Sequence, residues 1–375
     1  MRILFWMGTF WPAIGGVTVQ AARFLPALLE HGHEIVVVAF ASKDSVEVPC
    51  KVEHQSIPVY RIPLWKSHND LEQLITIRQE ISQIVHSFVP DVIHKNGVGI
   101  GDFFLHSTSL PPSVPTLVAL HQDWPSGSDT LAQQTLRSAD WVVGVSETLL
   151  ERGRQLAPEI IPRSSVIHNA VTEPIIQPEA LPVLTPRLLC IGRLVSEKGF
   201  DIALRAAASI IGRFPGLRLI ITGDGPERVN LQRQATDLGI EKAVEFTGWI
   251  SPDAVPALLN TATAVLMPSR CQEAFGLIAL EAALMSRPVV ASRIGGIPEI
   301  VLHNQTGLLV EAGNSTALAE AISHLLDQPE IAVRMGQFAR ILALKRFSFM
   351  RYLEAYETLY RRVVADRRKN THSHL

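Results

Sequence analysis

Short apolar runs alternate with amphipathic stretches along the first half of the chain. Residues 1–6 form one such run, residues 18–30 form an amphipathic stretch, and residues 34–40 are again almost wholly apolar. Strands that are apolar on both faces are typical of parallel sheets covered by helices, so this order predicts a βαβ unit. The pattern continues with helices expected over residues 71–88 and 129–138 and strands over residues 91–94, 116–120, 141–145 and 166–167. We therefore expect one doubly wound domain in this half.

The periodicity stops in a proline-rich stretch, residues 172–186, which we interpret as an interdomain linker. A second series of apolar runs follows at residues 187–191, 217–221, 244–246, 264–267 and 289–291. The predicted fold class is thus α/β, with an N-terminal Rossmann-like domain over residues 1–171, a C-terminal one over residues 187–347, and a last helix with a basic tail over residues 348–375. Packing of that helix back onto the first domain is one arrangement that the pattern allows.

Composition narrows the classes of function. The 375 residues are 47% hydrophobic, which suffices for two cores, and the net charge of −2 provides no basic field for nucleic acid, so a small-molecule ligand is favoured. The cysteines, Cys50, Cys190 and Cys271, have no CxxC spacing, and we expect neither a disulfide nor a zinc site and assign the chain to the reducing cytoplasm. Proline and glycine at positions 12–16 interrupt the first apolar run before it resembles a signal peptide.

The densest group of polar signals lies in residues 268–282. Glu273 follows the apolar run of residues 264–267, so we expect it at the carboxyl end of a sheet, where open α/β folds bind ligands. Phe275 begins a segment that is expected to open a helix, whose first backbone N–H groups can bind an anion. Glu281 lies inside that helix. A carboxylate beside an anion site suggests a ligand that carries both hydroxyl and phosphate groups.

Other candidates in the second half follow predicted strands in the same way. Arg193 and Lys198 come after the run of residues 187–191, and two cations at the mouth of a sheet could neutralise a diphosphate. Gly223 and Gly225 follow the next run and allow a tight turn before Pro226. Two basic residues in a loop are more often simply solvated, and their place after a strand is what makes them candidates.

In the first half, Gly15 and Gly16 lie between the first strand and its helix, where backbone can approach a phosphate closely. His121 follows a predicted strand and is a stronger candidate than His94, which ends the neighbouring one, although a lone histidine is more often structural. The glycines within residues 97–101 lack the GxGxxG spacing of a dinucleotide site.

Five motifs occur in order along the chain: GGV from Gly15, GRLVSEKG from Gly192, GDGPE from Gly223, the glutamates at 273 and 281, and GGIPEIV followed by TGLLV within residues 295–310. In combination they resemble the retaining glycosyltransferases of family 4. The likeness covers nearly the whole chain and is loose between about residues 42 and 110. It implies the GT-B fold, in which two doubly wound Rossmann-like domains face a central cleft.

The resemblance also implies a nucleotide-sugar donor that is held mainly by the second domain. By position in the motifs, the residues that would contact the donor diphosphate are Gly15, Gly16, Arg193, Lys198, Phe275, Gly276 and Leu277. Glu281 would bind the ribose, Trp249 and Ile250 would contact the base, and Gly223 and Gly225 would belong to a further loop of the donor site. The resemblance gives Glu273 and His121 as catalytic residues near the sugar. The chain departs from the family at Asn169-Ala170, where Asn-Gly is frequent. Residues 270–272 are a variable segment, so donor preference is not carried over.

The expected reaction is transfer of a sugar, with retention, from a UDP-sugar in preference to a GDP-sugar, to an acceptor hydroxyl. Cations would stabilise the leaving diphosphate, and since no second carboxylate is evident as a nucleophile, a front-face route fits better than double displacement. No two aspartates are spaced as D-x-D, so we expect no metal or other cofactor. Rival interpretations are a nucleotide-sugar epimerase or hydrolase of the same fold and a non-catalytic nucleotide-sugar-binding module. A nicotinamide dehydrogenase is disfavoured.

The acceptor is left open between a sugar, a lipid and a small molecule. The first-domain loops expected to hold it, residues 10–12, 94–103 and 122–128, mix aromatic, apolar and polar residues. Five cations lie in the tail: Arg361, Arg362, Arg367, Arg368 and Lys369. We interpret the tail as a solvated end, the alternative being contact with anionic headgroups at the inner membrane face.

Overall fold

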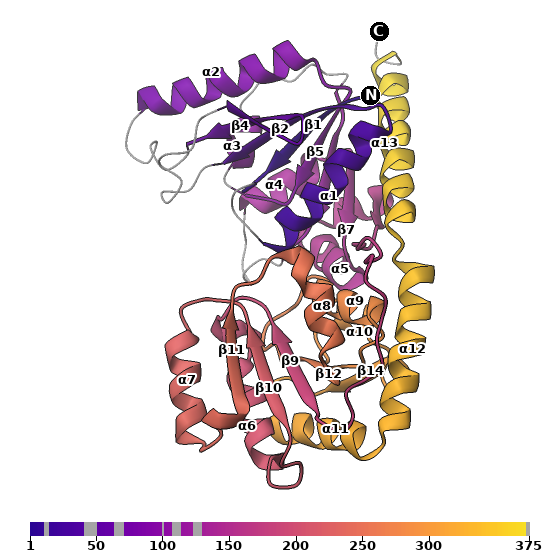
Figure 1. The fold of residues 1–375 in the computed structure, drawn as a ribbon. Coiled ribbons are helices and arrows are strands. Elements are labelled where there is room, and N and C mark those ends of the chain that lie inside the picture. The colour runs from indigo at the N-terminus through magenta and orange to yellow at the C-terminus, as the bar shows by residue number, and fades with distance from the viewer. Residues whose placement is uncertain are drawn as a thin grey trace. The chain divides into compact units, whose positions relative to one another are not determined.

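The apolar runs of the sequence form the strands of two separate sheets (Figure 1). The computed structural model describes residues 1–10, 15–40, 51–63, 71–99, 101–106, 114–122 and 130–372. The chain divides into two units, one made of Met1–His168 and Met350–Leu375 and the other of Asn169–Phe349. Trp11, Pro12 and residues 123–128, which belong to the predicted acceptor loops, lie outside the described residues, as does Cys50.

The first unit contains a sheet with the strand order β3-β4-β2-β1-β5-β6-β7-β8. All described pairings are parallel except that of β3 with β4. The strands are β1 (Arg2–Met7), β2 (Glu34–Phe40), β3 (Lys51–His54), β4 (Ile57–Ile62), β5 (Val92–Asn96), β6 (Thr116–Leu120), β7 (Trp141–Gly144) and β8 (Ser164–Val166). The central ones are buried on both faces, as a parallel sheet covered by helices requires.

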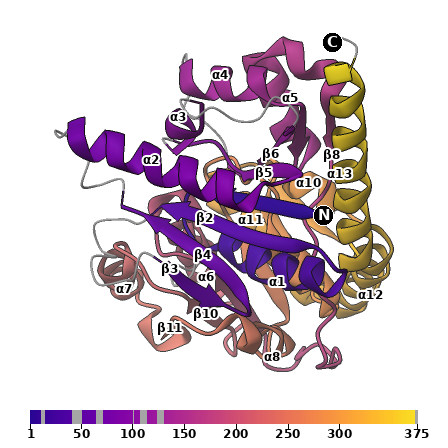
Figure 2. The same cartoon turned by 90° about the horizontal axis from the view of Figure 1, so that it is seen from above.

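Helices cover the first sheet on both faces. They are α1 (Gly16–Glu30), α2 (Leu71–Phe88), α3 (Gly101–His106), α4 (Thr130–Ser138), α5 (Glu147–Leu156) and, from the end of the chain, α13 (Phe349–His372). Both views place α13 beside α1 (Figures 1 and 2). The Phe24 ring of α1 lies edge to face with Tyr352 of α13 at a centroid distance of 5.0 Å. The last helix is therefore part of the core of the first unit.

The second unit contains a wholly parallel sheet in the order β11-β10-β9-β12-β13-β14. Its strands are β9 (Arg187–Ile191), β10 (Arg218–Thr222), β11 (Val244–Gly248), β12 (Ala264–Met267), β13 (Val289–Ser292) and β14 (Gly307–Val310). Its helices are α6 (Phe200–Ile210), α7 (Arg228–Asp237), α8 (Val255–Asn260), α9 (Leu277–Leu284), α10 (Ile297–Ile300), α11 (Ser315–Asp327) and α12 (Pro329–Arg346). Both units are thus Rossmann-like, in agreement with the predicted fold class.

The proline-rich stretch of residues 172–186 belongs to the second unit and is bonded to it. The Asn260 side chain donates to the carbonyl of Gln177 and accepts from the backbone N–H of Glu179. The buried guanidinium of Arg287 donates to the carbonyl of Glu179 and to Asn260 Oδ1. Because a buried guanidinium needs acceptors for its donors, these contacts fix this part of the stretch to the body of the unit.

No described helix is long and apolar enough to cross a membrane. Of the cysteines within the described residues, Cys190 and Cys271 are both free thiols.

Candidate functional site

The candidate site lies where the strand order of the second sheet reverses. Within the sheet, β10 and β11 lie on one side of β9, and the later strands β12, β13 and β14 lie on its other side. In such sheets ligands bind outside the carboxyl ends of the two strands at the reversal, because the loops that follow them diverge there. Those strands are β9 and β12, which pair directly. The loops after them contain Lys198 and Glu273, so the topology brings two residues 75 positions apart to one place.

Lys198 and Glu273 form an ion pair at this reversal. The Lys198 ammonium donates to Glu273 Oε1 over 2.6 Å, and the buried Ser269 hydroxyl donates to the same oxygen over 2.7 Å. Glu273 Oε2 makes no bond within the described part of the chain. The carboxylate is held through one oxygen and can accept hydrogen bonds from a ligand with the other.

The backbone of Glu273 is fixed from the neighbouring loop after β13. Its carbonyl accepts from the N–H of Gly296 over 2.8 Å. Gly295 has φ +53°, and a Cβ there would lie 2.1 Å from the Glu273 carbonyl oxygen. Only glycine fits a position where the backbone is in the left-handed conformation and lies this close to the backbone of another loop. The GG of the GGIPEIV motif therefore sets the position of the candidate carboxylate.

Arg270, which is not among the residues predicted from the sequence, ties the Glu273 loop to the start of α6. Its guanidinium binds both carboxylate oxygens of Asp201 and the carbonyl of Ser196. Burial works to raise the pKa of Asp201, but the guanidiniums of Arg270 and Arg205 outweigh it and hold that pKa below its usual range. A bidentate arginine–carboxylate pair is geometrically specific, so this contact restricts the loop that carries Ser269 and Glu273. In the sequence, the only indication of a role for Arg270 was that it is a cation three positions before Glu273.

The other cation predicted at the diphosphate, Arg193, is exposed in the loop after β9 and has no side-chain bond within the described residues. Gly223 and Gly225 pack against that same loop, since a Cβ on them would lie 1.9 Å from the Gly192 carbonyl oxygen and 2.5 Å from that of Leu194. The two glycines thus face protein backbone and allow the loops after β9 and β10 to lie in contact.

The predicted helix start is displaced by two residues. The helix α9 begins at Leu277, with Gly276 at its N-cap, whereas Phe275 is buried with its ring edge to face against Phe347 at a centroid distance of 5.7 Å. A role of Phe275 toward a ligand would therefore pass through its backbone. Glu281 lies in α9 and is half-buried.

The residues predicted for the base, Trp249 and Ile250, directly follow β11, the edge strand of the sheet. Trp249 is exposed and Ile250 is half-buried. Exposure of an indole beside the carboxyl edge makes its face available for stacking.

The remaining predicted residues lie in the first unit. Gly15 is the N-cap of α1, and its N–H donates to Thr18 Oγ1 over 2.7 Å, so that donor is already occupied, while Gly16 begins the helix. His121 follows β6 and is buried, and its Nε2 has no hydrogen-bond partner within the described residues. Burial lowers the pKa of His121 to about 4, which leaves the imidazole neutral near pH 7.

His94 lies inside β5 and is held by the end of the chain. Its Nδ1 is 2.5 Å from the Tyr360 hydroxyl of α13, and its ring stacks on Tyr356. Burial, followed by the charge of His121, keeps the pKa of His94 well below its ordinary value. This contact explains why a histidine occupies a central strand, and it gives His94 a structural partner that the sequence did not indicate.

At Ala170, where the sequence departs from the family, the residue is buried, and it does not appear among the described residues with positive φ. Alanine in place of the family's frequent glycine therefore causes no backbone strain at position 170.

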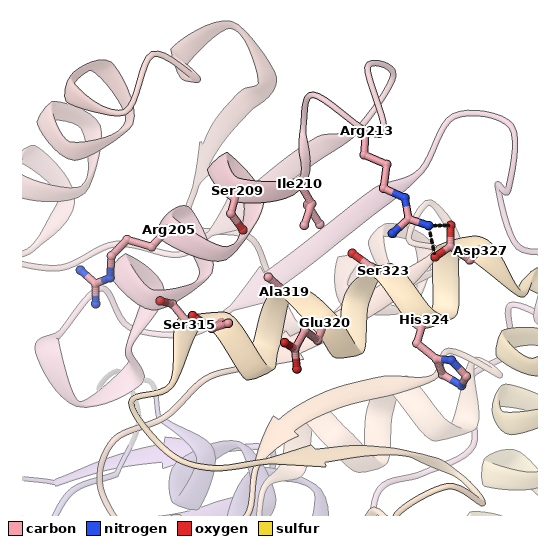
Figure 3. Close-up of a pocket in the computed structure, with 11 residues that line it drawn as sticks. Arg205, Ser209, Ile210, Arg213, Ser315, Ala319, Glu320, Ser323, His324 and Asp327 are labelled. Carbon is pink, nitrogen blue, oxygen red and sulfur yellow. Dashed lines mark hydrogen bonds and ion pairs between the residues drawn. The ribbon is translucent and has the colours of Figure 1, made fainter.

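A separate groove of about 530 Å³ lies between α6 and α11 (Figure 3). At one part of it, the Nη2 atom of Arg213 donates to both carboxylate oxygens of Asp327, over 2.9 and 2.8 Å. None of the predicted site residues lines this groove. Within the described residues, no group of three histidine, cysteine or acidic side chains is arranged to hold a metal ion.

Comparison with known proteins identifies the family. Residues 14–173 match the model of Glycosyltransferase Family 4, and residues 171–341 match that of Glycosyl transferases group 1. Glycogen synthase of Mycobacterium tuberculosis is 30% identical over 297 residues, which cover 73% of this chain and 69% of that protein. The chain belongs to glycosyltransferase family 4.

Other relatives of this family-4 chain match over a shorter length. The GDP-mannose-dependent alpha-(1-6)-phosphatidylinositol monomannoside mannosyltransferase of Mycobacterium tuberculosis is 38% identical over 161 residues, 41% of this chain and 42% of that protein. The match to several curated relatives spans less than half of their length, between 42% and 46%.

A solved structure shows the same fold for the family-4 chain. Anabaena HepE in complex with UDP superposes with a TM-score of 0.78 over 96% of this chain and 99% of that one, at 24% identity. A likeness at this identity shows the fold, GT-B, with its two Rossmann-like domains. The central cleft between the domains stays a prediction.

Proposed function

We propose that this chain is a retaining, metal-independent glycosyltransferase that moves a sugar from a nucleoside-diphosphate sugar to an acceptor hydroxyl. The observation that carries the proposal is the group of Lys198, Glu273 and Ser269 at the strand reversal of the second sheet. A UDP-sugar is favoured because the whole-length structural neighbour HepE was solved with UDP. The GDP-mannose-dependent relative, which matches over a shorter segment, makes a GDP-sugar the second choice.

The cations act on the diphosphate. An ammonium has three donors, of which Lys198 uses one on Glu273, so the others are free to meet phosphate oxygens. Arg193 on the same loop and the N-terminus of α9 add positive potential. Negative charge develops on the diphosphate as it leaves, and preorganised donors stabilise that charge without further rearrangement.

The carboxylate positions the sugar. Glu273 Oε1 is occupied by Lys198 and Ser269, and Oε2 is the oxygen that would accept from a sugar hydroxyl. A carboxylate tied on one side in this way is suited to binding and charge balance more than to nucleophilic attack. We therefore favour the front-face route: the bond from the anomeric carbon to the phosphate oxygen breaks, the bond to the acceptor oxygen forms on the same face, and the departing phosphate takes the acceptor proton.

The other donor contacts are proposed from the family motifs. Glu281 in α9 would bind the ribose hydroxyls, and the exposed Trp249 with Ile250 would contact the base. His121, with its neutral ring and unbonded Nε2, would exchange one hydrogen bond with the sugar from the first unit. Because Lys198 and Arg193 supply the positive charge that a metal ion supplies elsewhere, chelator should leave the rate unchanged.

The experiment starts with a thermal-shift panel of UDP-, GDP- and ADP-sugars, followed by acceptor screening with the stabilising donor. Glu273→Gln should lower turnover at saturating nucleotide sugar about 100- to 1,000-fold, by analogy with the loss of one hydrogen bond made in the transition state, while UDP binding changes little. Lys198→Met should weaken UDP binding as well. The matched control is Glu197→Gln, an exposed carboxylate beside Lys198, which should behave as wild type.

Three results would contradict the proposal. Full activity of Glu273→Gln would remove the carboxylate from the mechanism. Consumption of the donor at full rate without any acceptor would indicate a hydrolase or epimerase. Loss of activity in chelator, with recovery on adding a divalent cation, would exclude metal-independent catalysis.

A further inference from the structure

The helix α12 exposes apolar side chains on its outer face. Ile341 is 60% exposed, Phe338 40% and Leu344 37%. Residues three apart on a helix lie on neighbouring turns of one face, so Ile341 has Phe338 on one side and Leu344 on the other. Figure 1 shows α12 along the outside of the second unit.

This outer face is additional to the face that packs the helix. Ala332, Met335, Ala339 and Ala343 are buried against the unit, and a Cβ on Gly336 would lie 2.0 Å from the carbonyl oxygen of Ser286. The alanines and Gly336 let the helix approach the core closely. Because they already complete its packing, Phe338, Ile341 and Leu344 contribute nothing comparable to the core of the unit.

A second exposed apolar segment is joined to α12 through an ion pair. The Arg340 guanidinium of α12 is ion-paired with Glu173. Ile175 and Ile176 follow two and three residues after that contact, and they are 97% and 43% exposed. We call Phe338, Ile341 and Leu344 together the apolar patch. A group of exposed aliphatic and aromatic side chains of this kind marks an interaction surface.

The charges on the same helix are mainly positive. Arg334, Lys345 and Arg346 are exposed, and Glu330 is the only acidic residue in the sequence of α12. Arg334 lies one turn before Phe338, and Lys345 one turn after Ile341. Apolar residues flanked by long cationic side chains on a surface helix are typical of helices that lie in the membrane interface.

We propose that the apolar patch and the cations of α12 dock this protein on an anionic lipid bilayer, with the apolar side chains at the boundary of headgroups and acyl chains. Exposed cations around the patch complement the negative surface of such a bilayer. A stable protein interface commonly uses about 20 to 30 residues on each side, far more than this patch provides. A lipid surface requires no such complementary shape.

The basic tail of α13 is a weaker candidate for the same contact. Each of its described arginines has an acidic partner within the first unit: Arg361 with Glu357, Arg362 with Asp366, Arg367 with Asp140 and Arg368 with Asp91. Its positive charge is therefore largely balanced in place, and no large apolar group accompanies it in the way that Ile341 accompanies Arg334 and Lys345.

The test is co-sedimentation of the full chain with vesicles of phosphatidylcholine that contain roughly one third phosphatidylglycerol, against vesicles of phosphatidylcholine alone. Wild type should bind the anionic vesicles and be released by salt. Ile341→Glu should weaken binding about tenfold or more, because a carboxylate replaces the centre of the patch. The matched control is Val229→Glu on α7, where the side chain is 62% exposed and should not matter.

Three outcomes would overturn the proposal. The first is a wild-type chain that ignores anionic vesicles. The second is normal vesicle binding by the Ile341→Glu variant together with loss of vesicle binding in the double variant Arg361→Gln with Arg368→Gln. That result would assign the membrane contact to the tail. The third is self-association that Ile341→Glu abolishes without any vesicle binding, which assigns the patch to a second copy. If Ile341→Glu melts below wild type, Arg334→Gln with Lys345→Gln replaces it and should weaken binding at low salt.

Discussion

The two sheets reverse their strand order in the same way, yet their carboxyl edges differ in chemistry. In the second unit the reversal carries an ion pair, Lys198 with Glu273, that is only partly buried. In the first unit the ion pair at the reversal, Lys95 of β5 with Asp102, is wholly buried. The nearby histidines, His94 and His121, are also buried and are neutral near pH 7 because burial lowers the pKa of each ring. The two edges therefore differ in whether their charged groups are partly exposed, as in the second unit, or buried, as in the first.

The two edges also differ in how far along the chain their supports come from. Glu273 is held by Ser269, Lys198 and the loop of Gly295, all within the second unit. His94 is held by Tyr360, which is 266 residues away and arrives only with the last helix. The charged site is assembled from loops that meet at one sheet edge within one unit, whereas the buried histidine depends on the last helix of the chain.

The largest effect on this comparison is expected from Gly295→Ala. The new Cβ would meet the Glu273 carbonyl oxygen, and the residue would have to keep φ +53°. We expect a loss of about 2 to 4 kcal/mol in the free energy of unfolding of the second unit, from left-handed strain and overpacking together. Activity should fall at least about tenfold, because the Glu273 loop must shift. Chemical denaturation and steady-state assays measure the two quantities.

Gly313→Ala separates strain from contact in that experiment. Gly313 also has positive φ, +81°, but a Cβ there has nothing within 4 Å. This variant should lose only about 1 to 2 kcal/mol and keep wild-type activity. If both variants lost activity equally, the contact between Gly295 and Glu273 would have no specific effect on activity.

Most of the fold follows from the sequence because parallel strands are continuous apolar runs. The prediction missed the hairpin of β3 and β4, where burial alternates along β4 and the turn residues Gln55 and Ser56 adopt positive φ without a glycine to mark them. It also missed α5, although Ser146 is an N-cap that accepts from the N–H of Leu149 and belongs to a type of residue favoured there.

For the site, the sequence placed Lys198 and Glu273 after the correct strands but treated them as contacts to different parts of the donor. Their pairing depends on β9 lying next to β12, which a linear pattern does not contain. The same reason explains why Ser269 and Arg270 were not selected, since each acts through a partner from another segment. Residues whose role is to hold another residue are visible only once the topology is known.

The second prediction concerns the helix that completes the first unit. Glu357 of α13 accepts from His33 Nε2 over 2.8 Å and lies 3.3 Å from His31 Nδ1, with Arg361 also facing it at 3.7 Å. Burial works to raise the Glu357 pKa, but the bonds and charges of His33 and His31 outweigh it and lower that pKa. Replacing the buried carboxylate by Glu357→Gln should cost about 1 to 3 kcal/mol of unfolding free energy at pH 7.

The sign of the pH dependence follows from the lowered pKa. A carboxyl whose pKa is lower in the folded state contributes stability above its unfolded pKa and loses it as pH falls through the folded value. The gap in unfolding free energy between wild type and Glu357→Gln should therefore narrow below about pH 4. Glu354→Gln, an exposed position one turn earlier on α13, is the control and should show no gap. If the difference in unfolding free energy between the two proteins stayed constant down to acid pH, the effect of Glu357→Gln would be due to altered packing and not to the lost charge.

The smallest effect is expected at His121, where the prediction is an absence of change. Because burial lowers its pKa to about 4, the ring signal of His121 in a proton NMR titration should stay constant between pH 6 and 8, with Gln in place of His121 identifying the signal. The unfolded chain takes up a proton near pH 6.5 and the folded one does not, so the stability that this ring contributes is complete above pH 6.5 and declines as pH falls toward 4. A midpoint near 6.5 in the folded protein would mean that water reaches the ring, and the contrast between a partly exposed edge and a buried one would then be lost.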